Sequence, residues 1–169
     1  MSRRSVVVMP GDGIGKVVLP EALRVLEAAG FAADWIAADI GWDFWIREGN
    51  PLPQRTIDLI ARHKVALFGA ITSKPKAAAA KELAPELQGQ GHVYYSPIVG
   101  LRQGFDLDLS VRPCITFPGN PLNFIRRGAD GGAEEPRVNA VVFRQNTEGL
   151  YAGVEWTNPP DQVWNALAS

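Results

Sequence analysis

Residues 138–156 read VNAVVFRQNTEGLYAGVEW, and this stretch joins a strand pattern to a cation and a phenol. The segment Val138–Phe143 consists mostly of short, β-branched or aromatic side chains, which predicts a strand buried on at least one face. Arg144 ends that run, and turn-forming residues follow it. Tyr151 lies seven positions after the arginine, ahead of a second short β-prone segment.

Arg144 and Tyr151 have two interpretations when only these residues are considered. A guanidinium at a strand end with a phenol nearby on a polar loop suits a carboxylate or phosphate ligand. The alternative is an arginine paired with a neighbouring Asp or Glu and a tyrosine packed at a sheet edge. The residue pattern leaves both interpretations open.

The first third of the chain alternates strand and helix patterns. Apolar runs at Ser5–Met9, Ala33–Ala37 and Val65–Gly69 predict buried parallel strands. Two amphipathic patterns predict helices between them. The first runs from residue 14 to 29 and ends at Gly30, with an inward face of Ile14, Val18, Ala22, Val25, Leu26 and Ala29. The second covers Pro53–His63 with Ile57, Ile60 and Ala61 inward. This order predicts an α/β fold with an open parallel sheet and right-handed crossover helices.

Two loops lie where such a sheet places its ligands. Pro10–Gly15, PGDGIG, is glycine-rich, but the dinucleotide fingerprint requires a third glycine where Lys16 stands. We therefore interpret these glycines first as a tight turn. The loop GAITSKP, residues 69–75, follows the third strand and offers the hydroxyls of Thr72 and Ser73.

The middle of the chain carries aromatic and alanine-rich segments. We expect Trp42, Phe44 and Trp45 to be core residues rather than an aromatic ligand box. Residues 76–90 predict a partly helical surface excursion broken at Pro85. A helix and then a strand ending at 112–113 follow, and residues 118–136 predict a loop with a short helix and an exposed turn. The last residues, 161–168, predict the start of a helix.

Three blocks of this sequence resemble the β-decarboxylating dehydrogenases, the family of isocitrate, homoisocitrate and 3-isopropylmalate dehydrogenases. FRQNTEGLYAG resembles their R-x-N-[ST]-E-[GD]-x-Y signature. LRQGFDLDLSVRP, Leu101–Pro113, and MPGDGIGKVVLPEALRVLEAAG resemble two further family blocks. The blocks stand in family order over nearly the whole chain, which corresponds to the family's N-terminal half. The resemblance implies that residues 1–107 begin a large α/β domain and that 108–169 begin a smaller α/β domain with a dimer-clasp arm.

The resemblance also implies a set of site residues. Arg102, Arg112 and Arg144 would form a three-guanidinium clamp for substrate carboxylates, and Ser96 would be a further substrate-binding residue. Tyr151 matches the family's proton donor, and Thr72 matches a position near the nicotinamide of NAD or NADP. The family's metal ligands for Mg²⁺ or Mn²⁺ and its partner-subunit lysine base correspond to positions beyond residue 169. We therefore expect no turnover by the 169-residue chain alone.

The implied reaction is the NAD(P)-dependent oxidative decarboxylation of a 2-hydroxy polycarboxylic acid. YAGVEW and Ser96 favour isocitrate. The run Ser96–Arg102, SPIVGLR, is closer to homoisocitrate dehydrogenases, and the apolar pair Ile98 and Val99 would also suit 3-isopropylmalate. A hypothesis of another class is a non-catalytic partner subunit or a truncated paralogue that binds a carboxylate without chemistry.

Composition limits the partners and the compartment. The chain has 17 basic and 18 acidic residues and a formal charge of −1, so it offers no general field for nucleic acid or an anionic membrane. The apolar stretch near the start is too short for a membrane span or a signal segment. A single cysteine, Cys114, rules out an internal disulfide, and we interpret it as a small buried filler rather than a nucleophile. We expect a cytoplasmic protein that forms a homodimer, with an apolar face and a sheet edge exposed when this chain stands alone.

Overall fold

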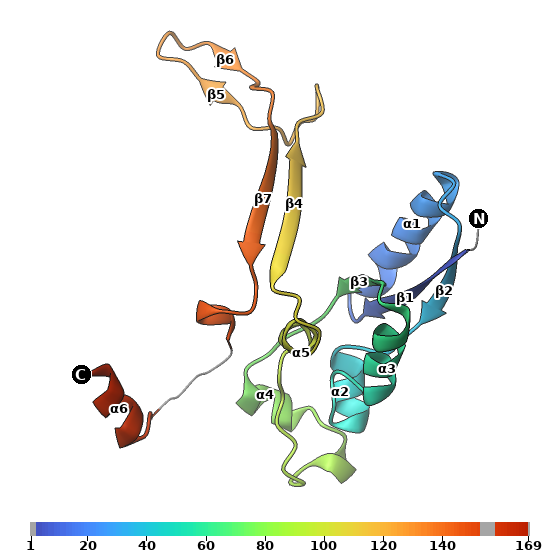
Figure 1. The fold of residues 1–169 in the computed structure, drawn as a ribbon, viewed down its shortest axis with the longest axis vertical. Helices are drawn as coiled ribbons and strands as arrows, with labels where there is room; N and C mark the ends of the chain where they lie inside the picture. The colour runs from blue at the N-terminus through green and yellow to red at the C-terminus, as the bar shows by residue number, and fades with distance from the viewer. Residues whose placement is uncertain (1–2, 153–157, 169) are drawn as a thin grey trace. The chain divides into compact units, whose positions relative to one another are not determined.

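The computed structural model describes residues 3–152 and 158–168, and its ribbon is drawn in Figure 1. The chain divides into two compact units, one ending at Leu101 and the other beginning at Arg102. The division between the family's two domains, expected after residue 107, stays a prediction.

The first unit is built on a three-stranded parallel sheet. Its strands are β1 (Arg4–Gly11), β2 (Ala33–Ala37) and β3 (Ala66–Ala70), in the order β2-β1-β3. The crossover helices α1 (Gly15–Ala28) and α3 (Gln54–His63) lie on either side of these strands in Figure 1. The crossover from β1 to β2 and the one from β2 past β1 to β3 run in opposite directions along the sheet, so right-handed connections place their helices on opposite faces. The predicted α/β class is confirmed.

The helix α1 turns a different stripe toward the sheet from the one predicted. Gly15 and Leu19 are buried and Leu23 is half-buried, whereas Ile14 and Val25 are 64% and 68% exposed. The two stripes are one residue apart, and both are apolar, so helical periodicity alone could not choose between them. Leu26 is the one member of the predicted face that turns inward, and it is half-buried.

Short helices close the first unit around an aromatic core. They are α2 (Trp42–Glu48), α4 (Lys76–Lys81) and the 3₁₀ turn η1 (Pro85–Leu87). The core cluster consists of Trp42, Trp45, Ala79, Leu83 and Tyr94. Trp42 and Trp45 are therefore core residues, as predicted. Residues 76–90 are partly helical and broken at the predicted proline, but they are no mere surface excursion because Ala79 and Leu83 are buried in this core.

The helix α3 buries a polar side chain. Thr56 and Ile60 face inward, whereas Ala61, predicted to be inward, is exposed. The hydroxyl of Thr56 donates to the carbonyl oxygen of Asp39 over 2.6 Å and accepts from the backbone N–H of Asp39 over 3.1 Å. Thr56 can therefore replace an apolar residue in the core, because its hydroxyl is fully hydrogen-bonded.

The second unit contains a two-stranded antiparallel ribbon. The strands are β4 (Leu109–Ile115) and β7 (Asn139–Gln145), which lie side by side in Figure 1, with the small hairpin β5 (Arg126–Arg127) and β6 (Ala133–Glu134) at one end. The helix α5 (Pro97–Gly104) straddles the division between the units. The 3₁₀ turn η2 (Gly149–Tyr151) and the predicted helix α6 (Asp161–Leu167) complete the described elements.

Five expectations for this second unit are wrong, the first being the burial of Cys114, which is exposed on β4. Residues 118–136 contain the hairpin β5–β6 in place of the expected short helix. β4 runs past the predicted end at Arg112–Pro113 to Ile115, and β7 includes Arg144. β7 is not buried: Val142 and Phe143 are 50% and 64% exposed, because no third layer of described residues covers the ribbon. The second β-prone segment expected after Tyr151 lies outside the described residues.

Candidate functional site

Three elements of the second unit bring two arginines and a tyrosine together. Arg102 stands near the end of α5, Arg144 near the end of β7 and Tyr151 in η2. The guanidinium carbon of Arg144 lies 4.4 Å from the centroid of the Tyr151 ring, and that of Arg102 lies 5.8 Å from it. Both cations therefore lie within the range of a cation–π interaction with one ring.

The turn between Arg144 and Tyr151 is organised by Gln145. Its side-chain oxygen accepts from the backbone N–H groups of Thr147 (2.9 Å) and Glu148 (2.8 Å). Gly149 follows with φ at +59°, a conformation that favours glycine. These bonds fold the chain back so that Tyr151 returns over Arg144.

A second contact holds the tyrosine turn against α5. The side-chain amide of Gln103 donates to the carbonyl oxygen of Ala152 over 2.9 Å. Gln103 is the neighbour of Arg102, and Ala152 is the neighbour of Tyr151. The bond therefore fixes the arginine and the tyrosine relative to each other.

Arg112 shares one face of the ribbon with Arg144. In the β4–β7 register Ser110 pairs with Arg144, and Arg112 pairs with Val142. Side chains alternate between faces along a strand, so the two arginines are diagonal neighbours on one face. Their backbone positions are about 7–8 Å apart in such an arrangement. The guanidinium Nε of Arg112 donates to the hydroxyl of Ser110 over 3.3 Å.

None of these three arginines forms an ion pair in the part of the chain that the structure describes. The ion pairs in those described residues join carboxylates to other cations, namely Arg3, Lys16, Arg24, Arg55, Lys74 and Arg126. Guanidinium groups carry five N–H donors in a planar fork that matches a carboxylate. Arg102, Arg112 and Arg144 therefore present positive charge and hydrogen-bond donors suited to an anionic ligand.

The loop after β3 in the first unit is tied to the glycine-rich turn by Asp12. Its side chain is 4% exposed, and one carboxylate oxygen accepts from the N–H (2.7 Å) and the hydroxyl (2.5 Å) of Thr72. The other oxygen accepts from the N–H of Trp42 at the start of α2, over 2.5 Å. Because the Thr72 hydroxyl gives its proton to Asp12, its oxygen can only accept from a ligand.

The glycines of this turn permit close backbone packing. A Cβ on Gly11 would lie 1.9 Å from the carbonyl oxygen of Ala70, and one on Gly15 would lie 2.1 Å from that of Pro10. Gly11 also has φ at +78°. The turn is thus packed directly against the end of β3, in keeping with its interpretation as a tight turn.

Tyr94 supports the same loop from the core side. Its hydroxyl donates to the carbonyl oxygen of Thr72 over 3.3 Å and lies 3.4 Å from the Ser73 hydroxyl. Burial raises the pKa of the Tyr94 phenol. Tyr94 therefore stays neutral at physiological pH and can keep donating to the loop.

Two predicted site residues are not part of the second unit. Thr72 and Ser96 belong to the first unit, and Ser96 stands just before α5, where its carbonyl oxygen accepts from the N–H of Gly100 over 3.0 Å. No local pattern indicates the role of Asp12, because its partner Thr72 is 60 residues away. Asn146, which sequence reasoning also missed, is buried near the end of β7.

Residues 3–152 and 158–168 contain no group of three or more His, Cys, Asp or Glu side chains that would hold a metal ion. The described residues therefore do not fit the Mg²⁺ or Mn²⁺ ion that the family resemblance implies. The ligands of that ion remain a prediction for positions beyond residue 169. No helix of the described residues is long and apolar enough to cross a bilayer.

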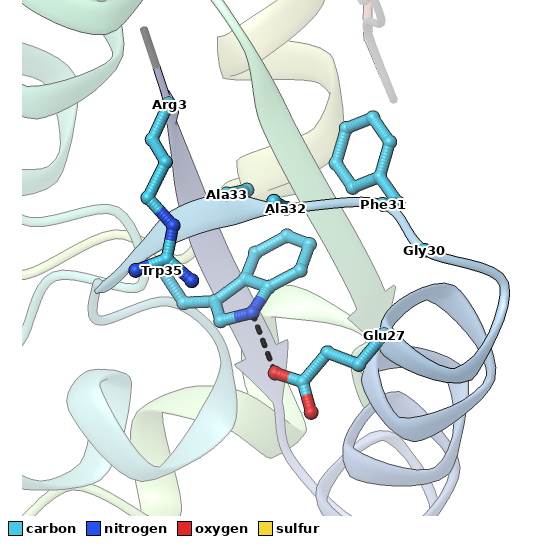
Figure 2. A pocket seen from close by; sticks show the side chains of 7 residues that line it. All are labelled: Arg3, Glu27, Gly30, Phe31, Ala32, Ala33 and Trp35. Carbon is cyan, nitrogen blue, oxygen red and sulfur yellow. Dashed lines mark hydrogen bonds between the residues drawn. The ribbon is translucent and has the colours of Figure 1, made fainter. Parts of the chain in front are cut away.

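A cavity of about 330 Å³ lies at the end of the three-stranded sheet that is opposite to the Thr72 loop (Figure 2). Arg3, Ala33 and Trp35 line it near the amino ends of β1 and β2, and the indole N–H of Trp35 donates to Glu27 over 2.9 Å. Open α/β sheets bind ligands at the carboxyl ends of their strands. This cavity is therefore separate from the loop that carries Thr72.

Comparisons with known proteins agree in one family. The family model for isocitrate/isopropylmalate dehydrogenase matches residues 5–166. The chain is 38% identical to Protein DlpA of Legionella pneumophila over 165 residues, which are 96% of this chain and 24% of that protein. It is 36% identical to an NADP isocitrate dehydrogenase of Archaeoglobus fulgidus, covering 90% of this chain and 32% of the relative. It is 38% identical to a homoisocitrate dehydrogenase of Methanocaldococcus jannaschii, covering 89% and 39%.

A solved structure supports the same conclusion at the level of the fold. The crystal structure of isocitrate dehydrogenase from Methylococcus capsulatus matches with a TM-score of 0.70 and 32% identity, over 94% of this chain and 39% of that chain. The chain thus spans between a quarter and two fifths of the lengths of these relatives.

Proposed function

Because this chain belongs to the isocitrate/isopropylmalate dehydrogenase family, we propose that its protein oxidises and decarboxylates a 2-hydroxy polycarboxylic acid, with isocitrate as the favoured substrate. The relatives bearing this family's names are dehydrogenases, which supports an enzymatic role for the whole protein. The observation that carries the proposal is the position of Arg102 and Arg144 beside Tyr151, with no carboxylate of the described residues paired to either arginine.

Arg102, Arg112 and Arg144 are assigned to the substrate carboxylates. At neutral pH a polycarboxylic acid carries two or three negative charges, and bidentate contacts from permanently charged guanidinium groups match each of them. Each charge-assisted hydrogen bond is worth about 1.5–3 kcal/mol. Ser96 is a further proposed contact to the same substrate.

Tyr151 is assigned to the protonation of the product carbon. Loss of the 3-carboxylate as carbon dioxide leaves an enol, and its carbon must take a proton before the product leaves. The phenol lies against the guanidinium of Arg144, which would hold a substrate carboxylate in the same place. Tyr151 is therefore positioned to donate to an atom near that carboxylate.

NAD or NADP would supply the hydride acceptor when bound, and Mg²⁺ or Mn²⁺ the positive charge that polarises the substrate carbonyl. Thr72 is the proposed cofactor contact in this chain. Its hydroxyl is bonded to Asp12 and faces a ligand only as an acceptor, which suits an N–H or O–H donor such as a carboxamide. We assign the metal ligands and the hydroxyl base to the part of the protein beyond residue 169, in a homodimer.

The substrate within the family is tested by assaying three acids. The full-length protein should reduce NAD or NADP with isocitrate faster than with homoisocitrate or 3-isopropylmalate, in the presence of Mg²⁺ or Mn²⁺. A preference for homoisocitrate would select the alternative that the sequence SPIVGLR supports. Turnover with none of the three acids would favour a non-catalytic carboxylate-binding subunit and contradict the proposal.

A further inference from the structure

The loop at residues 69–75, here called the cofactor loop, is held at a second point by Glu82, which follows directly after α4. The ammonium of Lys74 in this loop donates to both carboxylate oxygens of Glu82, over 2.6 and 2.9 Å. The indole N–H of Trp42 donates to the same carboxylate over 2.9 Å. Glu82 therefore joins the cofactor loop to the first residue of α2.

Trp42 is the fixed point of this arrangement. It is 6% exposed and belongs to the aromatic core. The Lys74 ammonium lies 5.1 Å from the centroid of its ring, within the range of a cation–π interaction. The backbone N–H of Trp42 donates to Asp12, the carboxylate that holds Thr72. One buried residue thus donates to both carboxylates that hold the cofactor loop.

The path of the loop depends on such side-chain anchors, because residues 71–75 form no helix or strand. An ion pair on a protein surface usually contributes little, since two long side chains must be ordered to form it. Here the partly exposed Glu82 carboxylate is already oriented by the indole of Trp42. Hydrogen bonds from Lys74 and Trp42 lower the pKa of Glu82 below its ordinary value of 4.5, so the carboxylate is charged at neutral pH.

We propose that Glu82 is a positioning residue for the cofactor loop. By holding Lys74 against Trp42 it keeps Thr72, two residues earlier, in place to contact NAD or NADP, an inference that rests on the proposed function. Small displacements of a positioning group weaken the binding that depends on it. Loss of Glu82 should therefore weaken cofactor binding and spare the acid, whose proposed contacts Arg112 and Arg144 lie in the second unit.

The test measures dissociation constants for NAD, NADP and isocitrate by calorimetry, on full-length protein with Mg²⁺. Glu82→Gln and Lys74→Met should each weaken binding of the tighter cofactor about threefold to fivefold, the range of one ion pair. The dissociation constant for isocitrate should stay within about 1.5-fold of the wild type. The double variant should be no weaker than either single variant, because both substitutions remove the same contact.

Two matched controls come from the same segment of the chain. Glu86→Gln and Lys81→Met replace exposed residues that take part in none of the ion pairs among the described residues. Both should keep the wild-type dissociation constants. If Glu82→Gln fails to fold, Lys74→Met decides the question alone, because it leaves the bond between Trp42 and Glu82 in place.

Three results would overturn the inference. Tighter cofactor binding by Glu82→Gln with weaker binding by Lys74→Met would make Lys74 a direct cofactor contact that Glu82 holds back. An equal loss for cofactor and isocitrate would show a general loosening of the fold. Unchanged cofactor binding in both variants would refute the inference alone, whereas a wild type that binds neither NAD nor NADP would refute the proposed function with it.

Discussion

The carboxylate of Asp12 connects three segments that are far apart in the sequence. It accepts hydrogen bonds from Thr72 after β3 and from Trp42 at the start of α2, while its own N–H donates to the carbonyl oxygen of Ala70. A buried carboxylate with several strong donors is stabilised without a cation. One residue of the glycine-rich turn thus fixes the loop that carries the proposed cofactor contact.

Replacing Asp12 by alanine should destabilise the protein by about 3 kcal/mol. The substitution leaves the N–H groups of Thr72 and Trp42 buried without acceptors, and charge-assisted bonds are costly to remove. Urea unfolding of both proteins measures the change. Asp34→Ala is the control, because Asp34 is exposed and lies 3.8 Å from Arg3, and it should change the free energy of unfolding by less than about 0.5 kcal/mol. An equally small loss for both variants would refute the role of Asp12.

Glu48 should make stability depend on pH in the acid range. Hydrogen bonds from Arg55 lower the pKa of Glu48 below its ordinary value of 4.5. A lowered pKa in the folded state means that the contribution is complete above the ordinary value and disappears as pH falls through the folded value. Glu48→Gln should therefore lower Tm at pH 7, and the gap to the wild type should close toward pH 3.

The control for this pH dependence is a weaker surface pair. Glu21→Gln removes one bond to Arg24 on the exposed side of α1, and its effect on Tm at pH 7 should be smaller. A gap between wild type and Glu48→Gln that stays constant from pH 7 to pH 3 would show that the carboxylate charge does not act through Arg55.

At the scale of elements, apolar runs bounded by glycine or proline located the strands correctly. β2 has the predicted bounds, and β1 and β3 differ from prediction by one or two residues at each end. The stripe that α1 buries could not be predicted, because two adjacent stripes of this helix are apolar. The burial of β7 was wrong for a different reason: its pattern fits a covered strand, but nothing in the described residues covers it.

The site shows the same division between local and distant information. The proximity of Arg144 to Tyr151 follows from a turn encoded within eight residues, with Gln145 as its organiser. Arg102 reaches the same ring only because α5 meets that turn, which no local pattern reveals. Only the family resemblance predicted that Arg102 and Tyr151 belong to one site.

The segment 76–90 should contribute to stability as part of the core. Leu83 is 4% exposed and belongs to the cluster of Trp42 and Trp45. Leu83→Ala should cost about 2–4 kcal/mol in the free energy of unfolding, as expected for a cavity in a packed core. Leu122→Ala, at a position 90% exposed, should cost less than about 0.5 kcal/mol. A similar small cost at both positions in urea unfolding would make the segment a surface excursion after all.

At the scale of the whole molecule, the ribbon has two chemically different faces. One carries Arg112 and Arg144, and the other carries exposed apolar side chains, among them Val111 and Phe143. The exposed stripe of α1 adds a second apolar surface in the first unit. The chain covers at most two fifths of the relatives compared, so the proposed activity belongs to the whole protein.

The most direct test of the account is the KM for the 2-hydroxy acid substrate, measured on full-length protein carrying Arg144→Lys. Lysine keeps the charge but loses the bidentate fork, so we predict that KM rises ten- to a hundredfold. Arg126→Lys is the matched control: Arg126 is exposed and paired with Glu134, and its substitution should leave KM within twofold of the wild type. A KM for Arg144→Lys that equally stays within twofold would contradict the assignment of this arginine cluster to substrate carboxylates.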